Sequence, residues 1–221
     1  MSAVHHPQSI PEPRWRRLPE ERPRQIIDAA LEVFGERGLA GARLDDIAKR
    51  AGVSKGTIYL YFPSKEALFV EVIREMVIAN IERHASRLGS DTPTDQLRDY
   101  VRAVWGYVRS PAFPTVHRLI TAELHHFPDL VRFFTEEVGA RTIRVLADIL
   151  QRGVESGEFR PLDPLATARM LHAMLIKHGE WCAHRELFTH VAATSDESVL
   201  DQLLDFCVAA VRSPTAAATA R

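Results

Sequence analysis

The sequence predicts an all-α protein of about nine helices, and two observations support this prediction. Hydrophobic residues recur with the 3.6-residue period of amphipathic helices from about Arg24 to Arg212, and no segment alternates in the way that strands do. Clusters rich in proline, glycine and small polar residues interrupt this period where helices are expected to end, at 89–93, 110–114, 127–128, 157–164 and 189–196.

The composition says little about the partners of the chain. It contains 28 basic and 29 acidic residues, so the net charge of −1 does not indicate nucleic acid, and any such affinity needs a local patch. The two cysteines and the polar, proline-rich start of the chain predict a cytoplasmic protein without disulfides. No apolar run approaches the roughly 20 residues that span a bilayer, so no membrane contact is expected. We expect residues 1–20 and 213–221 to be a disordered arm and tail.

The first predicted helix begins near Arg24 and has one apolar side. Pro23 suits its first turn, where a backbone N–H would have no partner, and Gly38 suits a left-handed stop. Asp28 and Glu32 lie on the opposite, charged side. The apolar stripe consists of Ile26, Ile27, Ala30, Leu31, Val33 and Phe34. This pattern predicts a helix and does not indicate a function.

Two short helices with a glycine-centred turn between them are predicted from Arg43 to Leu68. Gly52 ends the first helix because glycine tolerates positive φ, and Ser54 can cap the second helix, at 55–61. A two-turn helix, a three-residue turn and another short helix form the helix-turn-helix pattern, which places its second helix in the major groove of DNA. The apolar face of the first of these helices consists of Leu44, Ile47 and Ala48.

The second of these helices is too short and too polar to exist for its own packing. Only Ile58 and Phe62 are expected to anchor it, so its other side chains are left for a partner. We expect Lys55 and Thr57 to meet base edges, and the tyrosine hydroxyls and Lys65 to meet phosphates. From residue 37 to residue 65, six basic residues accompany two acidic ones, a local charge of +4. The alternative is a helical hairpin that binds nothing and whose lysines are simply solvated. It explains each residue of the stretch taken alone, but not the ordered combination of helix, glycine turn, cap and basic residues.

The segment IAKRAGVSKGTIYLYFPSKEAL, residues 47–68, closely resembles the signature of the TetR repressor family. FGERG, residues 34–38, matches the end of that family's first helix, and the resemblance covers about Arg24 to Val72. It implies an all-α dimer with a ligand pocket in the C-terminal domain. It also implies DNA reading by the residues that match the family's motif, which are Lys55, Gly56, Thr57, Tyr59, Tyr61 and Lys65.

One position departs from the family's pattern. The family usually has a serine or threonine that caps the helix before the turn, which here begins at Leu44. This chain has Ala42 and Arg43 at the capping position instead. The loss of a cap costs about 1 kcal/mol, but Arg43 can replace a hydroxyl–phosphate contact with an ionic one. With the cap residue Ser54, the predicted DNA-binding set is Arg43, Ser54, Lys55, Gly56, Thr57, Tyr59, Tyr61 and Lys65.

We expect residues 21–66 to form the helix-turn-helix domain and residues 67–212 a larger ligand-binding and dimerisation domain. The segment Leu165–Ile176 is apolar nearly all round, and the last helix, Asp196–Arg212, carries two adjacent apolar stripes. A helix that is apolar on every side has to be buried on every side. We therefore expect these two helices to form a four-helix interface between two subunits. A thick core within one subunit is the alternative.

A ligand pocket is expected among aromatic, histidine and methionine side chains of the middle helices. Such a mixture suits an apolar ligand with one polar group, although side chains of this kind also fill ordinary cores. The candidates are Trp105, Phe113, His117, Leu124, Phe134, Met174, His178 and Trp181.

Metal and enzyme chemistry find little support in the sequence. His178 and Cys182 share a helix face, but zinc needs about four ligands and only these two are on that face, so no metal site is predicted. The chain has no phosphate-binding glycine loop, nucleophile elbow or H-E-x-x-H motif, so neither an enzyme nor a cofactor is expected.

The sequence thus predicts a regulator that binds double-stranded operator DNA as a homodimer. In the favoured form it is a repressor that a small, largely apolar inducer releases from a near-palindromic operator. Two alternatives stay open, a ligand-dependent activator and a ligand-binding or protein-interaction module with an inactive DNA head. Minor-groove contact by the arm around Trp15, which three arginines flank, is also open.

Overall fold

The computed structural model describes residues 21–78, 92–191 and 195–214 of the chain. Within these ranges the regular structure is helical, apart from one isolated β-bridge between Phe159 and Arg212. When helical segments that continue one another are counted together, and the short 3-10 turn η5 (Thr189–Val191) is set aside, the described part contains nine helices, which confirms the all-α prediction. The predicted arm, and residues 215–221 of the predicted tail, lie outside the described residues.

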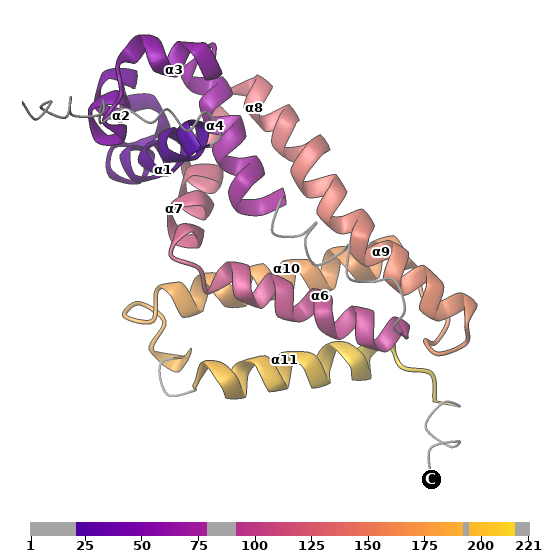
Figure 1. Cartoon of the computed structure of the whole chain (residues 1–221). Coiled ribbons are helices and arrows are strands. Elements are labelled where there is room, and N and C mark those ends of the chain that lie inside the picture. The colour runs from indigo at the N-terminus through magenta and orange to yellow at the C-terminus, as the bar shows by residue number, and fades with distance from the viewer. Residues whose placement is uncertain (1–20, 79–91, 192–194, 215–221) are drawn as a thin grey trace, which may run out of the picture.

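Three helices form a compact bundle at the N-terminal end, which we call the head (Figure 1). They are α1 (Glu21–Gly41), α2 (Leu44–Ala51) and α3 (Lys55–Tyr61). The backbone of α1 leaves helical geometry at Gly38, where φ is +72° and ψ is 170°. The positive φ expected of this glycine is present, but the ψ angle lies outside the left-handed helical region, and the residue is a kink within α1 rather than its end. The helix α4 (Lys65–Ile73) leads away from the head and continues as the π-helix η1 (Arg74–Ile78).

The remaining helices form a larger part, which we call the core. Its lower half in Figure 1 contains α6 (Pro93–Val108), α10 (Pro164–Ala183) and α11 (Asp196–Val211) side by side. Proline lies in the first turn of both α6 and α10, where it suits the helix start. A capping side chain precedes each of α6, α10 and α11 and accepts a backbone N–H of the first turn. The caps are Thr92, Asp163 and Ser195, in that order.

Two connections join the core to the head. The first rises from the end of α6 through α7 (Ala112–Arg118), η2 (Leu119–Glu123) and η3 (Leu124–His126). The second is a continuous rod that starts beside α4 and runs down the molecule in Figure 1. It consists of α8 (Pro128–Phe133), η4 (Phe134–Gly139) and α9 (Ala140–Glu155).

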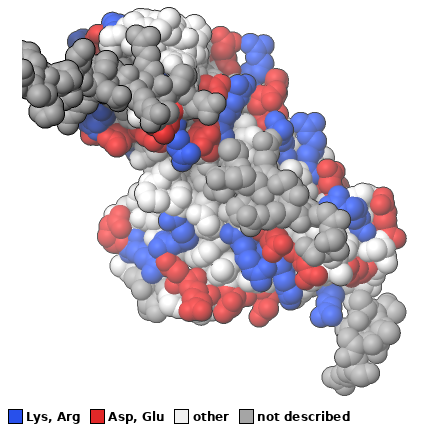
Figure 2. All heavy atoms as spheres, viewed as in Figure 1, with Lys and Arg blue, Asp and Glu red and all other residues white. Residues whose placement is uncertain are grey.

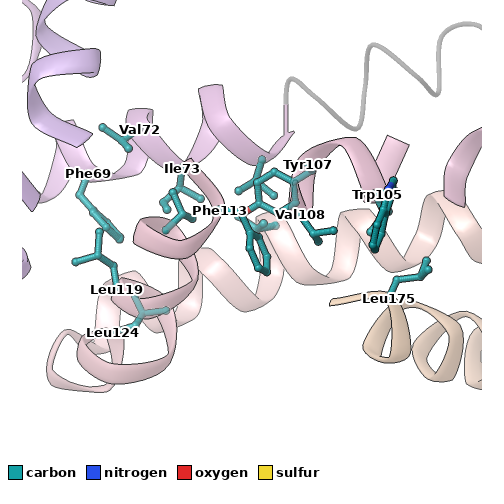
Figure 3. Packing of buried hydrophobic residues seen from close by; sticks show 14 of the residues in the cluster. Phe69, Val72, Ile73, Trp105, Tyr107, Val108, Phe113, Leu119, Leu124 and Leu175 are labelled. Atoms are coloured by element: carbon teal, nitrogen blue, oxygen red, sulfur yellow. The ribbon is translucent and has the colours of Figure 1, made fainter. Parts of the chain in front are cut away.

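One apolar cluster runs through both parts of the molecule. Figure 3 follows it from Phe69 and Ile73 of α4, past Leu119 and Phe113, to Leu175 of α10. On the head side, the ring of Phe34 meets that of Phe69 edge-on, with centroids 5.7 Å apart. Because this packing is continuous, a displacement of the core helices next to α4 changes the contacts that hold the head.

Three segments of the described chain are π-helical: η1, η2 and η4. A π-helix accommodates one more residue per hydrogen-bonded turn than an α-helix, and such turns occur frequently at functional sites. Each of the three continues an α-helix without a break in the chain.

The outer faces of α10 and α11 carry large apolar side chains that no described segment of the chain covers. Leu165 is 47% exposed, Met170 65% and Phe206 57%. The inner stripe of α11, which includes Leu203 and Cys207, is buried against the core. The all-round apolar character of these helices is therefore satisfied on one side only within one subunit.

Candidate DNA-binding head and ligand cavity

The turn between α2 and α3 has the geometry of a helix-turn-helix. Gly52 adopts φ +66° and ends α2, and its N–H faces the carbonyls of Ala48 and Lys49. Ser54 caps α3, since its side-chain oxygen accepts the N–H of Thr57 at 3.1 Å. Both features agree with the sequence-based expectation.

The outward side of α3 is exposed and mostly uncharged. Ile58 is the one buried residue of α3, and Phe62 directly after it is buried as well. Tyr59 is 51% exposed, Leu60 82% and Tyr61 40%. In Figure 2 the top of the head, where Figure 1 places α3, is largely free of charged atoms. Large apolar groups held outward on so short a helix indicate a surface made for a partner.

The polar groups of α3 are held in place by near neighbours. The hydroxyls of Ser54 and Thr57 lie 2.8 Å apart and share a hydrogen bond. Lys55 donates to Asp45 at 2.9 Å, and this bond raises the pKa of the Lys55 ammonium. Gly56 is exposed, and a Cβ built there would meet only the Ser54 oxygen, at 3.7 Å, so packing does not require a glycine at this position.

The basic patch of the head is smaller than the sequence count indicates. Arg50 makes two hydrogen bonds to Glu36, at 2.7 and 2.9 Å, and one to Glu32 at 2.9 Å. The bond to Arg50 lowers the pKa of Glu36. Arg37 likewise pairs with Asp46. Three of the six cations, Lys55 included, are thus paired, each with a carboxylate of a neighbouring helix.

The remaining predicted phosphate contacts differ in how free they are. Arg43 precedes α2 without a side-chain cap, as predicted, and is exposed without an ion pair to any described residue. Lys65 donates to the carbonyls of Ala40 and Ala42, both at 3.1 Å, so it closes the end of α1. An ammonium has three N–H donors, so one donor of Lys65 is left.

A cavity of about 480 Å³, which we call the core cavity, lies between the two connections and the lower helices. Its upper and outer walls come from the three π-helical segments and from α7 and α9, through Val77, Phe113, His117, Ile120, Thr121, Phe134, Val138, Gly139, Thr142 and Ile143. Its lower wall comes from α6 and α10, through Val104, Tyr107, His172, Ala173, Ile176, Lys177 and Glu180. Most of these side chains are apolar, which suits a largely apolar ligand.

A polar cluster lies at one place on the cavity wall. The imidazole of His117 stacks on Phe113 with ring centroids 5.1 Å apart, and its Nε2 lies 3.4 Å from Glu180. Lys177 donates to the same Glu180 oxygen at 2.9 Å. Burial raises the pKa of Glu180, but the bond to Lys177 and the nearby His117 outweigh it and hold that pKa below its usual value.

The segment α7–η2 contacts the head on its other side. Glu123 of η2 accepts the N–H of Leu39 at 2.6 Å and that of Ala40 at 3.4 Å, at the kink of α1. Arg118 donates to the carbonyl of Gly35 at 2.6 Å. We call Arg118 and Glu123 the α1 clamp. One short segment therefore lines the core cavity and holds the head.

Comparison with known proteins agrees with this architecture. Residues 26–72 match the family model of the bacterial regulatory proteins of the tetR family. Residues 95–212, more than half of the chain, match the C-terminal domain of AefR-like transcriptional repressors.

The chain belongs to the TetR family. It is a helix-turn-helix transcriptional regulator with a ligand-binding domain, and its relatives are regulators too. RutR of Escherichia coli K12 is 30% identical over 181 residues, which cover 81% of this chain and 84% of RutR. A TetR family regulator from Pseudomonas syringae pv. tomato superposes with a TM-score of 0.64 at 26% identity, over 89% of this chain and all of the other. FadR of Bacillus subtilis, solved in complex with stearoyl-CoA, gives 0.64 at 25% identity, over 84% and 97%.

The cavity of this TetR-family chain includes some of the predicted ligand residues and not others. Phe113, His117 and Phe134 line it. The other candidates lie outside the lining: Trp105, Leu124, Met174, His178 and Trp181. Leu124 is buried beside Leu119, between head and core (Figure 3). The ring of Trp105 lies against that of His178, with ring centroids 6.3 Å apart. In α6 and α10 the cavity side is a different stripe of the helix from the aromatic stripe chosen from the sequence.

Sequence reasoning missed several residues of both sites. On the head, Leu60 was among the side chains left for a partner but was not included in the predicted DNA-binding set, although an apolar residue on the outward side of a two-turn helix is itself a signal. On the cavity wall it left out Tyr107, His172 and Glu180. Tyr107 lies three residues after Val104 on one stripe of α6, and this spacing was the available signal.

The described part of this TetR-family chain contains neither a cluster of metal ligands nor a membrane-spanning helix. No group of three potential metal ligands comes together there, and Cys182, paired with His178 in the sequence analysis, is buried. No described helix is both long and apolar enough to cross a bilayer.

Proposed function

We propose that this chain is a repressor that binds a near-palindromic operator as a homodimer and leaves it when a small, largely apolar molecule fills the core cavity. The observation that carries the proposal is that α7–η2 lines the cavity and also holds α1 through the α1 clamp. The match to AefR-like repressors supports repression, and the stearoyl-CoA complex of the related FadR supports a small-molecule ligand for this fold. The proposal places the protein in the cytoplasm and assigns it no catalytic step.

On the operator, the proposed contacts divide by type. Lys55 and Thr57 meet base edges, and the outward Leu60 offers an apolar contact to a thymine methyl group. Gly56 lets the backbone come close to a phosphate, and Ser54 keeps the start of α3 in position. Phosphate contacts come from Arg43, Tyr59, Tyr61 and the remaining N–H of Lys65.

The proposed dimer buries the outer faces of α10 and α11. These faces carry Leu165, Met170 and Phe206, which the single chain leaves exposed. Two helices from each subunit form a four-helix interface around a two-fold axis. Two-fold symmetry sets two copies of α3 about 34–36 Å apart, one helical turn of DNA, so the operator has two related half-sites.

Met170→Glu is expected to make the protein monomeric. The substitution places one carboxylate of each subunit in the apolar interface, and we expect it to weaken the dimer by roughly 2–4 kcal/mol. Leu187→Glu is the matched control, because Leu187 is at least as exposed as Met170, at 73%, but lies in the turn after α10. Sedimentation velocity separates monomer from dimer. A dimeric Met170→Glu protein would place the interface on another face.

The proposed release begins at the cavity wall. A molecule that fills the cavity displaces the side chains that α7–η2 turns toward it, such as Phe113 and Ile120. The α1 clamp passes this shift to α1, and α4–η1 passes a second shift through Val77. The ligand has to bind the released form more tightly than the DNA-bound form, typically by about 1–3 kcal/mol, for the effect to be useful.

The experiment that tests the proposal is selection of bound duplexes from a random DNA pool by the purified protein at a stated salt concentration. We expect a near-palindromic site with two half-sites, and we expect the Tyr59→Ala, Lys65→Ala double variant to lose it. Enrichment of no site above background would instead favour a ligand-binding or protein-interaction module with an inactive head. Transcription in vitro from a promoter that overlaps the selected site then separates repression from activation.

A further inference from the structure

The charges on the wall of the core cavity are paired with one another. Lys177 and Glu180 lie one helical turn apart on α10 and form an ion pair, and His117 approaches the same carboxylate. The Lys177 side chain is more than half exposed, so this cluster lies where the cavity opens toward solvent. A charged ligand deep in the cavity would meet apolar walls and no unpaired counter-charge among the described lining residues.

Tyr107 brings a neutral polar group to these apolar walls. Its side chain is more than nine-tenths buried and lines the cavity. The hydroxyl makes no hydrogen bond to a described residue. Its oxygen is not completely enclosed by protein atoms either, so it is open to a molecule in the cavity. Burial raises the pKa of Tyr107, so its hydroxyl keeps its proton. A buried donor without a partner calls for an acceptor on the ligand.

His172 brings a second neutral group. Its Nδ1 lies 2.8 Å from the hydroxyl of Tyr100. Burial raises the pKa of Tyr100 and lowers that of His172 to about 4, so both are uncharged near neutral pH. Tyr100 has no other hydrogen-bond partner among the described residues, so its hydroxyl donates to Nδ1. The proton of the His172 ring is then on Nε2, which lacks a described partner and is the second donor offered to the cavity.

We infer that the core cavity takes an uncharged, largely apolar molecule with a hydrogen-bond acceptor, of the ketone, ester or lactone class, and that Tyr107 or His172 donates to that acceptor. The inference rests on the proposed function, in which this cavity holds the releasing ligand. It follows from the chemistry of the wall, which has two neutral donors in an apolar surface and a cation that is already neutralised by Glu180.

Three probes with the same ten-carbon chain test the ligand class: decan-2-one, decanoate and decylammonium. Each is titrated against the full-length protein loaded with the fluorescent neutral probe N-phenyl-1-naphthylamine. We expect decan-2-one to displace the fluorophore at a concentration at least about ten-fold lower than either ion, because only the ions lose hydration of a full charge. Equal or better displacement by decanoate or decylammonium would overturn the inference, and so would a lack of displacement by all three.

Tyr107→Phe tests the donors. Loss of the hydroxyl should weaken decan-2-one binding about three- to ten-fold and leave the affinity for the fluorophore unchanged. Thr142→Val is the matched control, since Thr142 also lines the cavity but already donates to the carbonyl of Val138 at 2.8 Å, and it should change binding less than about two-fold. The assigned donors would be wrong if neither Tyr107→Phe nor His172→Phe weakened decan-2-one binding in a folded protein.

Operator affinity, followed by fluorescence anisotropy in the same titrations, separates this inference from the proposed function. Release of operator by decanoate but not by decan-2-one would keep ligand-released repression and overturn the ligand class. Tight binding of decan-2-one without any change in operator affinity would keep the ligand class and count against ligand-released repression.

Discussion

Replacement of Tyr59 by alanine is expected to weaken operator binding by roughly 2–4 kcal/mol per dimer, or about 30- to 1000-fold. The side chain projects from the outward side of α3 and half of its surface is exposed, so its loss removes little packing within the head. Both subunits of the dimer lose the contact, and its contribution is therefore counted twice. Titration of a labelled operator duplex at fixed salt measures the effect.

Two further proteins make the Tyr59 result interpretable. Tyr59→Phe keeps the ring and removes only the hydroxyl, so an intermediate loss assigns the difference to a phosphate hydrogen bond. Leu187→Ala removes a comparably exposed side chain far from α3 and should leave operator affinity unchanged. Unaltered operator binding by Tyr59→Ala, with an unchanged unfolding midpoint, would contradict the proposed orientation of α3 on DNA.

Gly38→Ala is expected to cost about 2–4 kcal/mol of unfolding free energy, well above the cost of Gly52→Ala. Both glycines have φ near +70°. Gly52 is in the left-handed helical region, where a Cβ costs about 1–2 kcal/mol, and Gly38, with ψ 170°, is in a region used almost only by glycine, where the cost is about 1–3 kcal/mol. At Gly52 a new Cβ would meet nothing within 4 Å, whereas at Gly38 it would lie 2.5 and 2.7 Å from the two carboxylate oxygens of Glu123. The carboxylate would have to leave Leu39 N–H, and a hydrogen bond to a charged group contributes about 1.5–3 kcal/mol.

A double-mutant cycle assigns the extra cost of Gly38→Ala to the α1 clamp. In a Glu123→Ala background the clash and the hydrogen bond are both absent, so Gly38→Ala should cost less than in the unmodified chain, by about the 1.5–3 kcal/mol of that hydrogen bond. Urea unfolding of the single and double variants gives the four free energies. Equal costs for Gly38→Ala and Gly52→Ala in the unmodified chain would mean that Glu123 moves aside freely, and the clamp would then be too weak to transmit a signal.

The fold and the DNA-binding head could be predicted in detail because their signals are local. The positive φ at Gly52, the cap at Ser54 and the anchor Ile58 each follow from residues a few positions apart in the chain. The period of apolar residues and the proline and glycine stops likewise give the number of helices.

The electrostatics of the head could not be predicted in the same way. The count from residue 37 onward left out Glu32 and Glu36, which lie on α1 yet bind Arg50 of α2. Lys65 was expected at a phosphate, but two of its donors bind carbonyls about 25 residues earlier in the chain. Both contacts depend on how α1 packs against later helices, which the local pattern does not contain.

The cavity could be predicted only in kind. Its aromatic and histidine character was anticipated, and Phe113, His117 and Phe134 were found. Successive residues on a helix differ by about 100° in direction, so a choice one position away selects another face. The sequence analysis selected Trp105 as a ligand residue, whereas Val104, one position earlier on α6, lines the cavity. Which face meets a cavity depends on the neighbouring helices, and the neighbours of α6 are far away in the sequence.

The three π-helical segments have a consequence for how this protein family diversifies. A π turn holds the extra residue left by a single-residue insertion without breaking the helix on either side. η1, η2 and η4 all line the core cavity, whereas the described part of α3 and the turn before it is free of such turns. Insertions and deletions of one residue can therefore reshape the cavity while the recognition helix keeps its register, so that a lineage can acquire a new ligand and retain its operator.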